Sequence, residues 1–391
     1  MTRQAAMGLC VALSAIALSA LVACATAEVK DDAHDALNQP HDEVATPARL
    51  PDTIPPQPLN AGATPISAIT WESSERVHIG YRDGTFVSAN LTTANLEARH
   101  VGMSSFPIAA LSPDGRTALI ASRPLVIFDT ESNQPILHFP DVKAFQAARF
   151  AFDGSFMVVA ETDGRVHIWS RRQLTGGGRG EENLKGLLER QNPEQSTRFA
   201  PFVGGLGVTA QNDVVFADAQ GQVFTWNIAQ QQTFKVMKLA AKPRSVAGTG
   251  SHVLATSTEG ELGVASINPP RFEKWSRQAH ANAVAAHPDD PTVLVTVTDT
   301  AIALLDVKTG EPHWTRPIAS GTFCGVNVAR LGGPVALCLD NALVLLDPDD
   351  GHPTAILDLV DGQATWRDAA GTVVASPPKV AAPAPAKADA R

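Results

Sequence analysis

The sequence predicts an all-β fold made of seven similar units, and three observations support this prediction. The first is a turn residue that recurs at a nearly fixed spacing and is followed each time by a short apolar run. These turn residues are Gly84, Pro124, Gly164, Gly221, Gly260, Thr300 and Asn341, with separations of 40, 40, 57, 39, 40 and 41 residues. A period near forty residues is the signature of a repeat architecture.

The second observation is another turn, about ten residues upstream in several units. It reads Ser112–Gly115 in one unit, Ala151–Gly154 in the next and His287–Asp290 in a later one. The runs before these turns are rich in small residues, which suit strands crowded around a central axis: Ile108–Leu111, Ala147–Phe150, Gly204–Val208, Ser245–Gly248 and Ala283–Ala286. Four short strands per unit around an axis form a β-propeller.

The third observation is composition. Hydrophobic residues make up 44% of the 391 residues and charged residues 18%, with 29 Gly and 28 Pro. This is the profile of a globular all-β protein with a substantial core. The formal net charge of −9 argues against nucleic-acid binding, because such binding needs a basic surface.

Residues 1–23 are expected to be a targeting segment. Arg3 supplies the positive start, and the uncharged stretch from Met7 to Ala23 has 17 residues, fewer than the roughly 20 of a stable membrane span. The segment ends in Leu21-Val22-Ala23-Cys24, which resembles the lipobox of bacterial lipoproteins.

The lipobox resemblance implies cleavage before Cys24 and acylation of its thiol. Acyl chains contribute about 0.8 kcal/mol per buried methylene, so several chains anchor a protein stably. The alternative is an ordinary secreted protein cleaved nearby. Ala25 stands where an Asp would signal retention in the inner membrane, so the resemblance implies the periplasmic face of the outer membrane.

Two segments outside the repeats are expected to lack a core. Residues 24–60 form an acidic, Pro-rich tether, and its last part, Pro56–Asn60, is expected to add an outer strand to the ring. Residues 376–391 are rich in Ala and Pro, a composition typical of disordered or polyproline-like tails.

The repeats resemble those of WD-repeat propellers. The resemblance rests on Ser112–Arg116, on Thr162–Trp169 and on His280 followed by His287–Asp289, and it covers roughly residues 61–359. Leu304–Trp314 is instead similar to the repeat of quinoprotein-type propellers, such as the lipoprotein BamB of outer-membrane-protein assembly.

The expected propeller domain spans residues 61–375. Seven turn residues predict seven blades. Gln363–Trp366 with Thr372–Ala375 is either a closing element or part of an eighth blade.

The long separation of 57 residues places an insertion at residues 171–198. Leu184, Leu187 and Leu188 follow a helical spacing, and Arg179 and Arg190 flank them. One interpretation is a short helix packed on the propeller. The other is a protein-docking element, and these five residues are our candidate docking site.

Two of the four cysteines remain after Cys10 leaves with the signal and Cys24 is acylated. Cys324 and Cys338 are expected on neighbouring strands, on either side of the Arg330–Pro334 turn. The periplasm permits disulfides, so these residues form either a bridge or two buried thiols.

The sequence shows no catalytic constellation, and the eleven His residues lack metal-ligand spacing. We therefore expect a non-catalytic scaffold without a cofactor that binds envelope proteins and reaches the membrane through Cys24. The alternative is a lactonase-, hydrolase- or quinoprotein-like propeller enzyme acting on a small or envelope-derived substrate. A polar, ion-binding cluster at the channel mouth would favour the enzyme, and a charged or aromatic outer face would favour the scaffold. The oligomeric state stays open.

Overall fold

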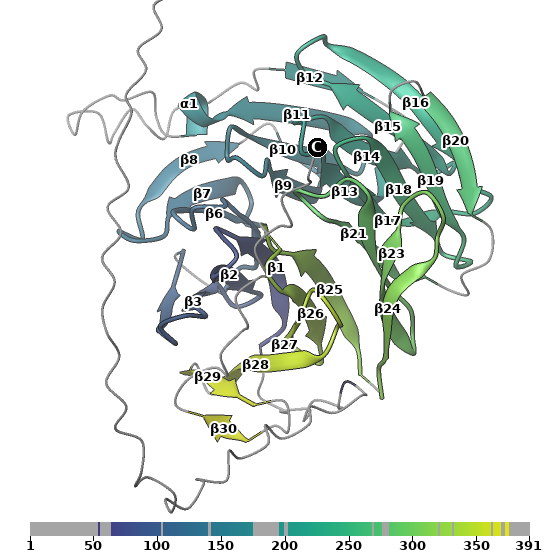
Figure 1. The fold of residues 1–391 in the computed structure, drawn as a ribbon. Coiled ribbons are helices and arrows are strands. Elements are labelled where there is room, and N and C mark those ends of the chain that lie inside the picture. Colours follow the sequence, from purple (N-terminus) through teal and green to yellow (C-terminus); the bar gives the residue numbers. More distant parts are fainter. Residues whose placement is uncertain are drawn as a thin grey trace, which may run out of the picture. The chain divides into compact units, whose positions relative to one another are not determined.

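Seven antiparallel sheets stand around a common axis in the computed structural model (Figure 1). The structure describes residue 54 and residues 64–374, except for residues 103–104, 140–141, 175–194, 199–201, 268–269, 276–280, 320, 331, 361–362 and 369–371. Each sheet is a blade, and its strands follow one another outward from the axis in chain order. The expected all-β, seven-bladed propeller is confirmed.

The strands of the first four blades, from the innermost outward, are as follows. Blade 1 has β1 (Ile66–Trp71), β2 (Arg76–Tyr81), β3 (Thr85–Asn90) and β4 (Leu96–His100). Blade 2 has β5 (Ile108–Leu111), β6 (Thr117–Ile120), β7 (Leu125–Asp129) and β8 (Pro135–Phe139). Blade 3 has β9 (Phe145–Phe150), β10 (Phe156–Glu161), β11 (Arg165–Ser170) and β12 (Gln195–Arg198). Blade 4 has β13 (Phe202–Val208), β14 (Val214–Asp218), β15 (Gln222–Asn227) and β16 (Gln232–Lys238).

The other three blades complete the ring. Blade 5 has β17 (Pro243–Gly248), β18 (His252–Ser257), β19 (Leu262–Ile267) and β20 (Pro270–Trp275). Blade 6 has β21 (Ala283–Ala286), β22 (Val293–Val297), β23 (Ala301–Asp306) and β24 (Pro312–Pro317). Blade 7 has β25 (Phe323–Val328), β26 (Val335–Leu339), β27 (Ala342–Leu346) and β28 (Pro353–Val360), followed by β29 (Gln363–Arg367) and β30 (Val373–Val374).

The last two strands decide the number of blades. β29 pairs with β28, and β30 pairs with β29, so they extend the sheet of blade 7 to six strands instead of starting an eighth blade. The inner strands β25 and β1 are neighbours, which closes the ring. In the part of the chain that the structure describes, blade 1 consists of β1 to β4 and blade 7 of β25 to β30, so these two blades share no strand across the closure.

The recurring turn residues lie in the turns between the second and third strands. Gly84, Gly164, Gly221 and Gly260 have φ between 81° and 91°, and Asn341 has φ of 70°. Glycine and asparagine tolerate this left-handed conformation, which tight hairpin turns require. Pro124 occupies the equivalent place in blade 2 with a cis peptide bond.

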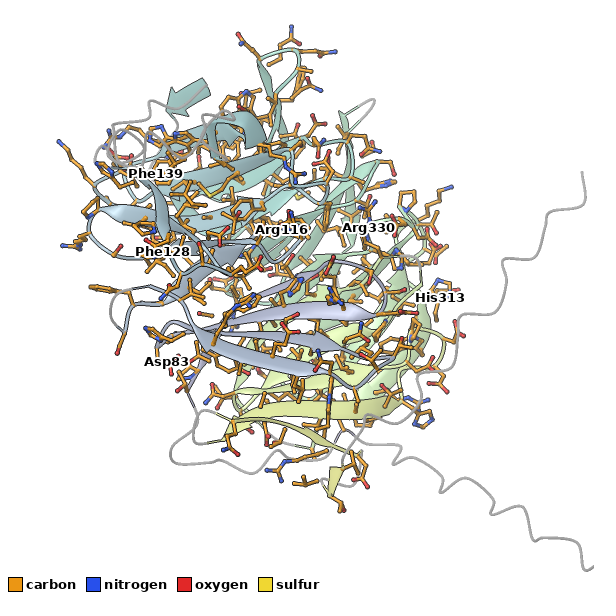
Figure 2. The ribbon with its side chains drawn as sticks, turned by 90° about the vertical axis from the view of Figure 1, so that its left-hand side faces the viewer. Asp83, Arg116, Phe128, Phe139, His313 and Arg330 are labelled. Atoms are coloured by element: carbon orange, nitrogen blue, oxygen red, sulfur yellow. A yellow bond between two sulfur atoms is a disulfide. The ribbon has the colours of Figure 1, made fainter. Side chains whose placement is uncertain are left out.

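The alternating strand directions give the ring two faces. The turns between first and second strands and those between third and fourth strands lie on one face, which we name the Arg330 face. The turns between second and third strands and the connections between blades lie on the other, the Asp83 face. Arg330 and Asp83 stand toward opposite sides of the view in Figure 2.

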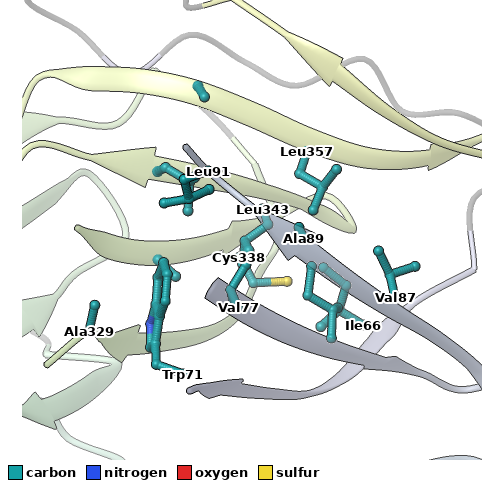
Figure 3. Close-up of a cluster of buried hydrophobic side chains, with 14 of the residues drawn as sticks. Ile66, Trp71, Val77, Val87, Ala89, Leu91, Ala329, Cys338, Leu343 and Leu357 are labelled. Atoms are coloured by element: carbon teal, nitrogen blue, oxygen red, sulfur yellow. The ribbon is translucent and has the colours of Figure 1, made fainter. Parts of the chain in front are cut away.

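The core is divided into apolar clusters that lie between neighbouring blades. Each of the seven clusters in the described part joins two adjacent blades. The cluster between blades 7 and 1, the closure interface, contains Trp71, Val77 and Leu91 from one side and Cys338 and Leu343 from the other (Figure 3). The ring is therefore held by side-chain packing between sheets.

The interface between blades 4 and 5 depends on glycine. A Cβ built on Gly205 of β13 would lie 2.6 Å from the backbone nitrogen of Val246 on β17, and one on Gly207 would lie 3.3 Å from Ala247 Cα. The two inner strands therefore meet backbone to backbone. This explains part of the small-residue pattern before the first turn of each unit.

The end of the insertion differs from the sequence interpretation, and the expected outer strand before the propeller is not tested. The insertion leaves blade 3 through a short helix, α1 (Arg171–Leu174), but its last four residues form β12, the fourth strand of that blade. The insertion therefore ends before Gln195 and not at residue 198, because blade 3 needs its outer strand. Pro56–Asn60 lies outside the described residues, whereas Ile54 forms an isolated parallel bridge with Ile318 at the end of blade 6.

Candidate functional site: the channel and the hollow beside its mouth

The seven inner strands enclose a channel of about 400 Å³. Most of the residues that line it are small or apolar, in agreement with the small-residue runs of the inner strands. Four aromatic rings also line it: Trp71, Phe150, Phe152 and Phe323. Of the described residues that line it, three are charged, and all three are arginines.

The three channel arginines differ in their partners. Nη2 of Arg330 lies 3.3 Å from Asp289 Oδ1. Arg244 donates a hydrogen bond to Asn282, whose amide in turn donates to Asp299. Among the described residues, Arg149 donates to the backbone carbonyl of its own neighbour, Ala148, at 3.2 Å. The surrounding protein lowers the pKa of the Arg149 guanidinium through desolvation, although the side chain is accessible from the channel.

A second hollow, of about 490 Å³, opens on the Arg330 face between the turns of blades 2 and 3. Four residues line both this hollow and the channel, so the two cavities are adjacent: Pro113, Phe150, Phe152 and Arg330. Its apolar lining residues are Ile136, Phe150, Phe152 and Leu174. Its charged residues are Glu72, Asp114, Arg116, Asp129, Asp153, Arg171 and Arg330.

Hydrogen bonds hold the charged rim of this hollow in place. Asp114 accepts from the hydroxyl of Ser112 at 2.6 Å and lies 3.3 Å from Nη2 of Arg171 in blade 3. Asp153 accepts from the backbone of Ser155 and from Asn212 of blade 4. Although burial alone would raise the pKa of Asp153, these hydrogen bonds together hold it below its usual range. The rim carboxylate of Asp153 is therefore ionised near neutral pH.

A buried carboxylate on the Asp83 face was missed by the sequence interpretation. Glu161, at the end of β10, is fully buried and accepts hydrogen bonds from the backbone nitrogens of Lys143 and Ala144 at 2.8 and 3.0 Å. Its other oxygen lies 2.8 Å from His167 Nε2 and 3.4 Å from Arg165 Nε. This group ties the connection between blades 2 and 3 to the third strand of blade 3.

The same arrangement recurs in two later blades. Asp340 accepts from the backbone nitrogen of Thr322 at 2.6 Å, and Glu261 accepts from that of Ala240 at 2.7 Å. The common sequence signal is an acidic residue at the turn between the second and third strands. These carboxylates hold the connections between blades.

Two of the four cysteines of the sequence meet in the structure. Cys324 of β25 and Cys338 of β26 form a disulfide, with their Cα atoms 5.2 Å apart. The register of this strand pair shifts between Phe323 and Gly325, and Cys324 occupies the bulge. The bulge explains why the facing residue could not be assigned from the sequence.

The other residues proposed from the sequence lie outside the described residues: Cys24, Arg179, Leu184, Leu187, Leu188 and Arg190. Within the described part, no group of three or more His, Cys, Asp or Glu could hold a metal ion. None of the helices there has the length and apolar character needed to span a membrane.

This geometry defines a seven-bladed β-propeller. No family model and no curated protein sequence matches the chain. Among solved structures, one titled "Structure of U3-55K" is similar, with a TM-score of 0.56 and 12% sequence identity over 73% of this chain and 90% of that one. At this identity the similarity concerns the fold alone.

Proposed function

We propose that this protein is a non-catalytic, lipid-anchored propeller that binds other proteins at the outer membrane of the bacterial envelope, where it serves outer-membrane assembly. The hollow on the Arg330 face carries the proposal. It combines partly buried aromatic and aliphatic residues with a charged rim, the arrangement found in protein interfaces with an apolar centre and a polar border.

Ile54 is attached to the ring on the face opposite the hollow. It is fully buried and hydrogen-bonded to Pro317 and Ala319 at the end of blade 6, on the Asp83 face.

Site-specific photo-crosslinking tests the binding face. A photoreactive residue replaces Arg116, which is exposed in the first turn of blade 2, and in a matched control it replaces Arg82, which is exposed on the Asp83 face. In intact cells we expect discrete protein adducts from position 116 and none from position 82.

A second change makes the crosslinking result specific. Phe152→Asp should abolish the adducts at position 116, because it places a charge on the apolar part of the hollow. Unchanged adducts in this variant, or equal adducts from both positions, would contradict binding at the hollow.

The insertion extends the same proposal. Leu174 is buried and lines the hollow, and the insertion follows it directly in the chain. Replacing residues 175–194 with a short Gly/Ser linker, with β12 kept, should leave the melting temperature within a few degrees and reduce the crosslinks from position 116. If that variant is stable and keeps every adduct, the insertion does not contribute to binding.

The anchor has its own test. Cys24→Ser should move the protein from the membrane pellet to the soluble periplasmic fraction, because the acyl chains attach through this thiol. Mass spectrometry of the wild-type N-terminus should find the acyl groups. An unmodified N-terminus together with unchanged pelleting of the variant would exclude the lipid anchor.

A further inference from the structure

Arg149 is the unusual residue of the channel. It is the second-last residue of β9, so it lies near the mouth that opens toward the Arg330 face. A guanidinium has five N–H donors, and the described residues provide one acceptor for them, the Ala148 carbonyl. The other two channel arginines, by contrast, contact Asp289 or the Asn282–Asp299 pair.

The described lining of the channel supplies no negative charge to balance Arg149. It includes neither Asp nor Glu, although the adjoining hollow has carboxylates such as Asp153. Desolvation alone accounts for the lowered pKa of Arg149, so no nearby carboxylate raises it. The guanidinium nevertheless remains charged at neutral pH, since its ordinary pKa exceeds 12. A cation in such surroundings attracts an anion more strongly than it would in water.

The space around Arg149 has the size and lining of a small-molecule site. The channel volume of about 400 Å³ lies within the usual range for ligand pockets. The aromatic rings of Phe150 and Phe152 offer apolar contacts beside the guanidinium. A planar guanidinium binds carboxylate and phosphate groups through two parallel hydrogen bonds.

We propose that the central channel binds a small organic anion, whose carboxylate or phosphate pairs with Arg149 and whose apolar body lies against Phe150 and Phe152. This site shares Phe150 and Phe152 with the hollow proposed for protein binding, but it requires neither a partner protein nor the lipid anchor.

Arg149 contributes little to the stability of the fold. Its side chain is exposed in the channel, and in the described part it has a single hydrogen bond to lose, to the Ala148 carbonyl. Arg149→Met keeps the length of the side chain and removes the charge. We therefore expect the unliganded variant to melt at the same temperature as the wild type.

Binding is tested on the full-length protein in detergent with benzoate, phenyl phosphate and the neutral control benzamide. Benzoate or phenyl phosphate should raise the wild-type melting temperature saturably at millimolar concentration, and benzamide should not. The stronger of the two anions identifies the head group. Arg149→Met should weaken this binding at least tenfold, whereas Arg330→Met, which removes an arginine already paired with Asp289, should change it less than threefold.

Chemical labelling provides a readout at the residue itself. Phenylglyoxal modifies accessible arginines, and mass spectrometry of peptides locates the adducts. The anion that stabilises the protein should protect Arg149 and leave the exposed control Arg82 equally reactive. No stabilisation by either anion, equal binding by Arg149→Met, or failure to protect Arg149 would overturn the proposal. If Arg149→Met does not fold, Arg149→Lys, which keeps the charge and loses the two-bond geometry, replaces it and should weaken binding.

Discussion

The interface between blades 4 and 5 brings two inner strands into backbone contact, whereas the closure interface between blades 7 and 1 keeps them apart with side chains. A Cβ on Gly205 would meet the backbone of Val246 at 2.6 Å, but one on Gly325 of β25 would meet only Ile69 Cδ1, at 3.8 Å. In the described part, ten buried residues form the cluster between blades 4 and 5, and sixteen form the closure cluster.

The two interfaces also differ in chain connectivity. Blades 4 and 5 are consecutive in the chain, so a short connection keeps them together. Blades 7 and 1 come from opposite ends of the propeller and share no strand. In the described part, non-covalent contacts alone hold the ring closed there, and an apolar cluster of sixteen buried residues provides them. The cluster between the consecutive blades 6 and 7 is nearly as large, with fifteen buried residues in the described part, so connectivity alone does not set the size of a cluster.

The largest expected effect comes from removing Trp366, which β29 contributes to the closure interface. Trp366 is buried, and its Nε1 donates to the Ala94 carbonyl at 3.3 Å. Trp366→Ala should cost about 3–5 kcal/mol and lower the melting temperature by roughly 6–20 °C.

The matched control is Trp226→Ala, which removes a buried Trp from the interface of blades 3 and 4. Hydrogen exchange should show faster exchange in β1 and β25 for Trp366→Ala alone. Equal exchange of these strands in both variants would refute the special role of the closure interface.

A smaller effect is expected from the disulfide. Cys324 and Cys338 are 14 residues apart, so the bridge contributes about 3 kcal/mol at most in the chain-entropy model. Both strands belong to blade 7, so reduction should lower the melting temperature without opening the closure interface. Peptides from unreduced, denatured protein should carry no thiol label at either position, whereas labelled peptides would show two free thiols.

Glycine substitutions compare the two interfaces directly. Gly205→Ala should destabilise the protein by about 1–3 kcal/mol, because the backbone of Val246 cannot move aside as a side chain can. Gly325→Ala, the same change in another inner strand, should have an effect within about 0.5 kcal/mol. Denaturant unfolding measures both, and equal costs would show that the close contact of β13 and β17 is not specific.

The smallest effect concerns pH and the interface between blades 1 and 2. His78 is buried, and its ring lies against Gly115 of blade 2. Desolvation lowers its pKa below 6.5, with Arg76 acting in the same direction and Glu72 and Asp114 opposing. The unfolded chain therefore binds more protons, so this contribution to stability is present above pH 6.5 and is lost as the pH falls through the lower folded-state pKa.

His78→Gln should consequently flatten the acid side of the stability profile. Melting temperatures of wild type and variant are compared between pH 7.5 and 5. His287, whose pKa burial also lowers, remains in both proteins and accounts for a shared decline. Identical slopes would show that His78 does not couple pH to stability.

The sequence predicted the features that depend on local backbone geometry. The turns at Gly84, Gly164 and Gly221 require positive φ, so these glycines indicated where the third strand of each blade begins. The features it missed depend on which distant segments meet. Ile54 pairs with Ile318, and Trp366 reaches Ala94, at separations that no local pattern records.

The candidate site also depends on contacts between distant segments, which local sequence patterns do not reveal. The hollow gathers residues from turns of blades 1, 2, 3 and 7, and each of these residues looks ordinary in its own turn. The sequence around Arg149 does not show that this residue is unusual. The difference is visible only in the folded ring, where its hydrogen-bond partner can be compared with the partners of Arg244 and Arg330. The residues that the sequence did single out for docking lie outside the described part, and their role stays a prediction.

Ile54 also determines how mechanical force enters the molecule. Two backbone hydrogen bonds, of 2.9 and 3.1 Å, and a fully buried side chain join it to the end of blade 6, twelve positions before β1 begins. A pull on the chain before Ile54 is therefore resisted first at blade 6. The tension reaches β1, and with it the unsupported closure of the ring, only after this attachment has broken.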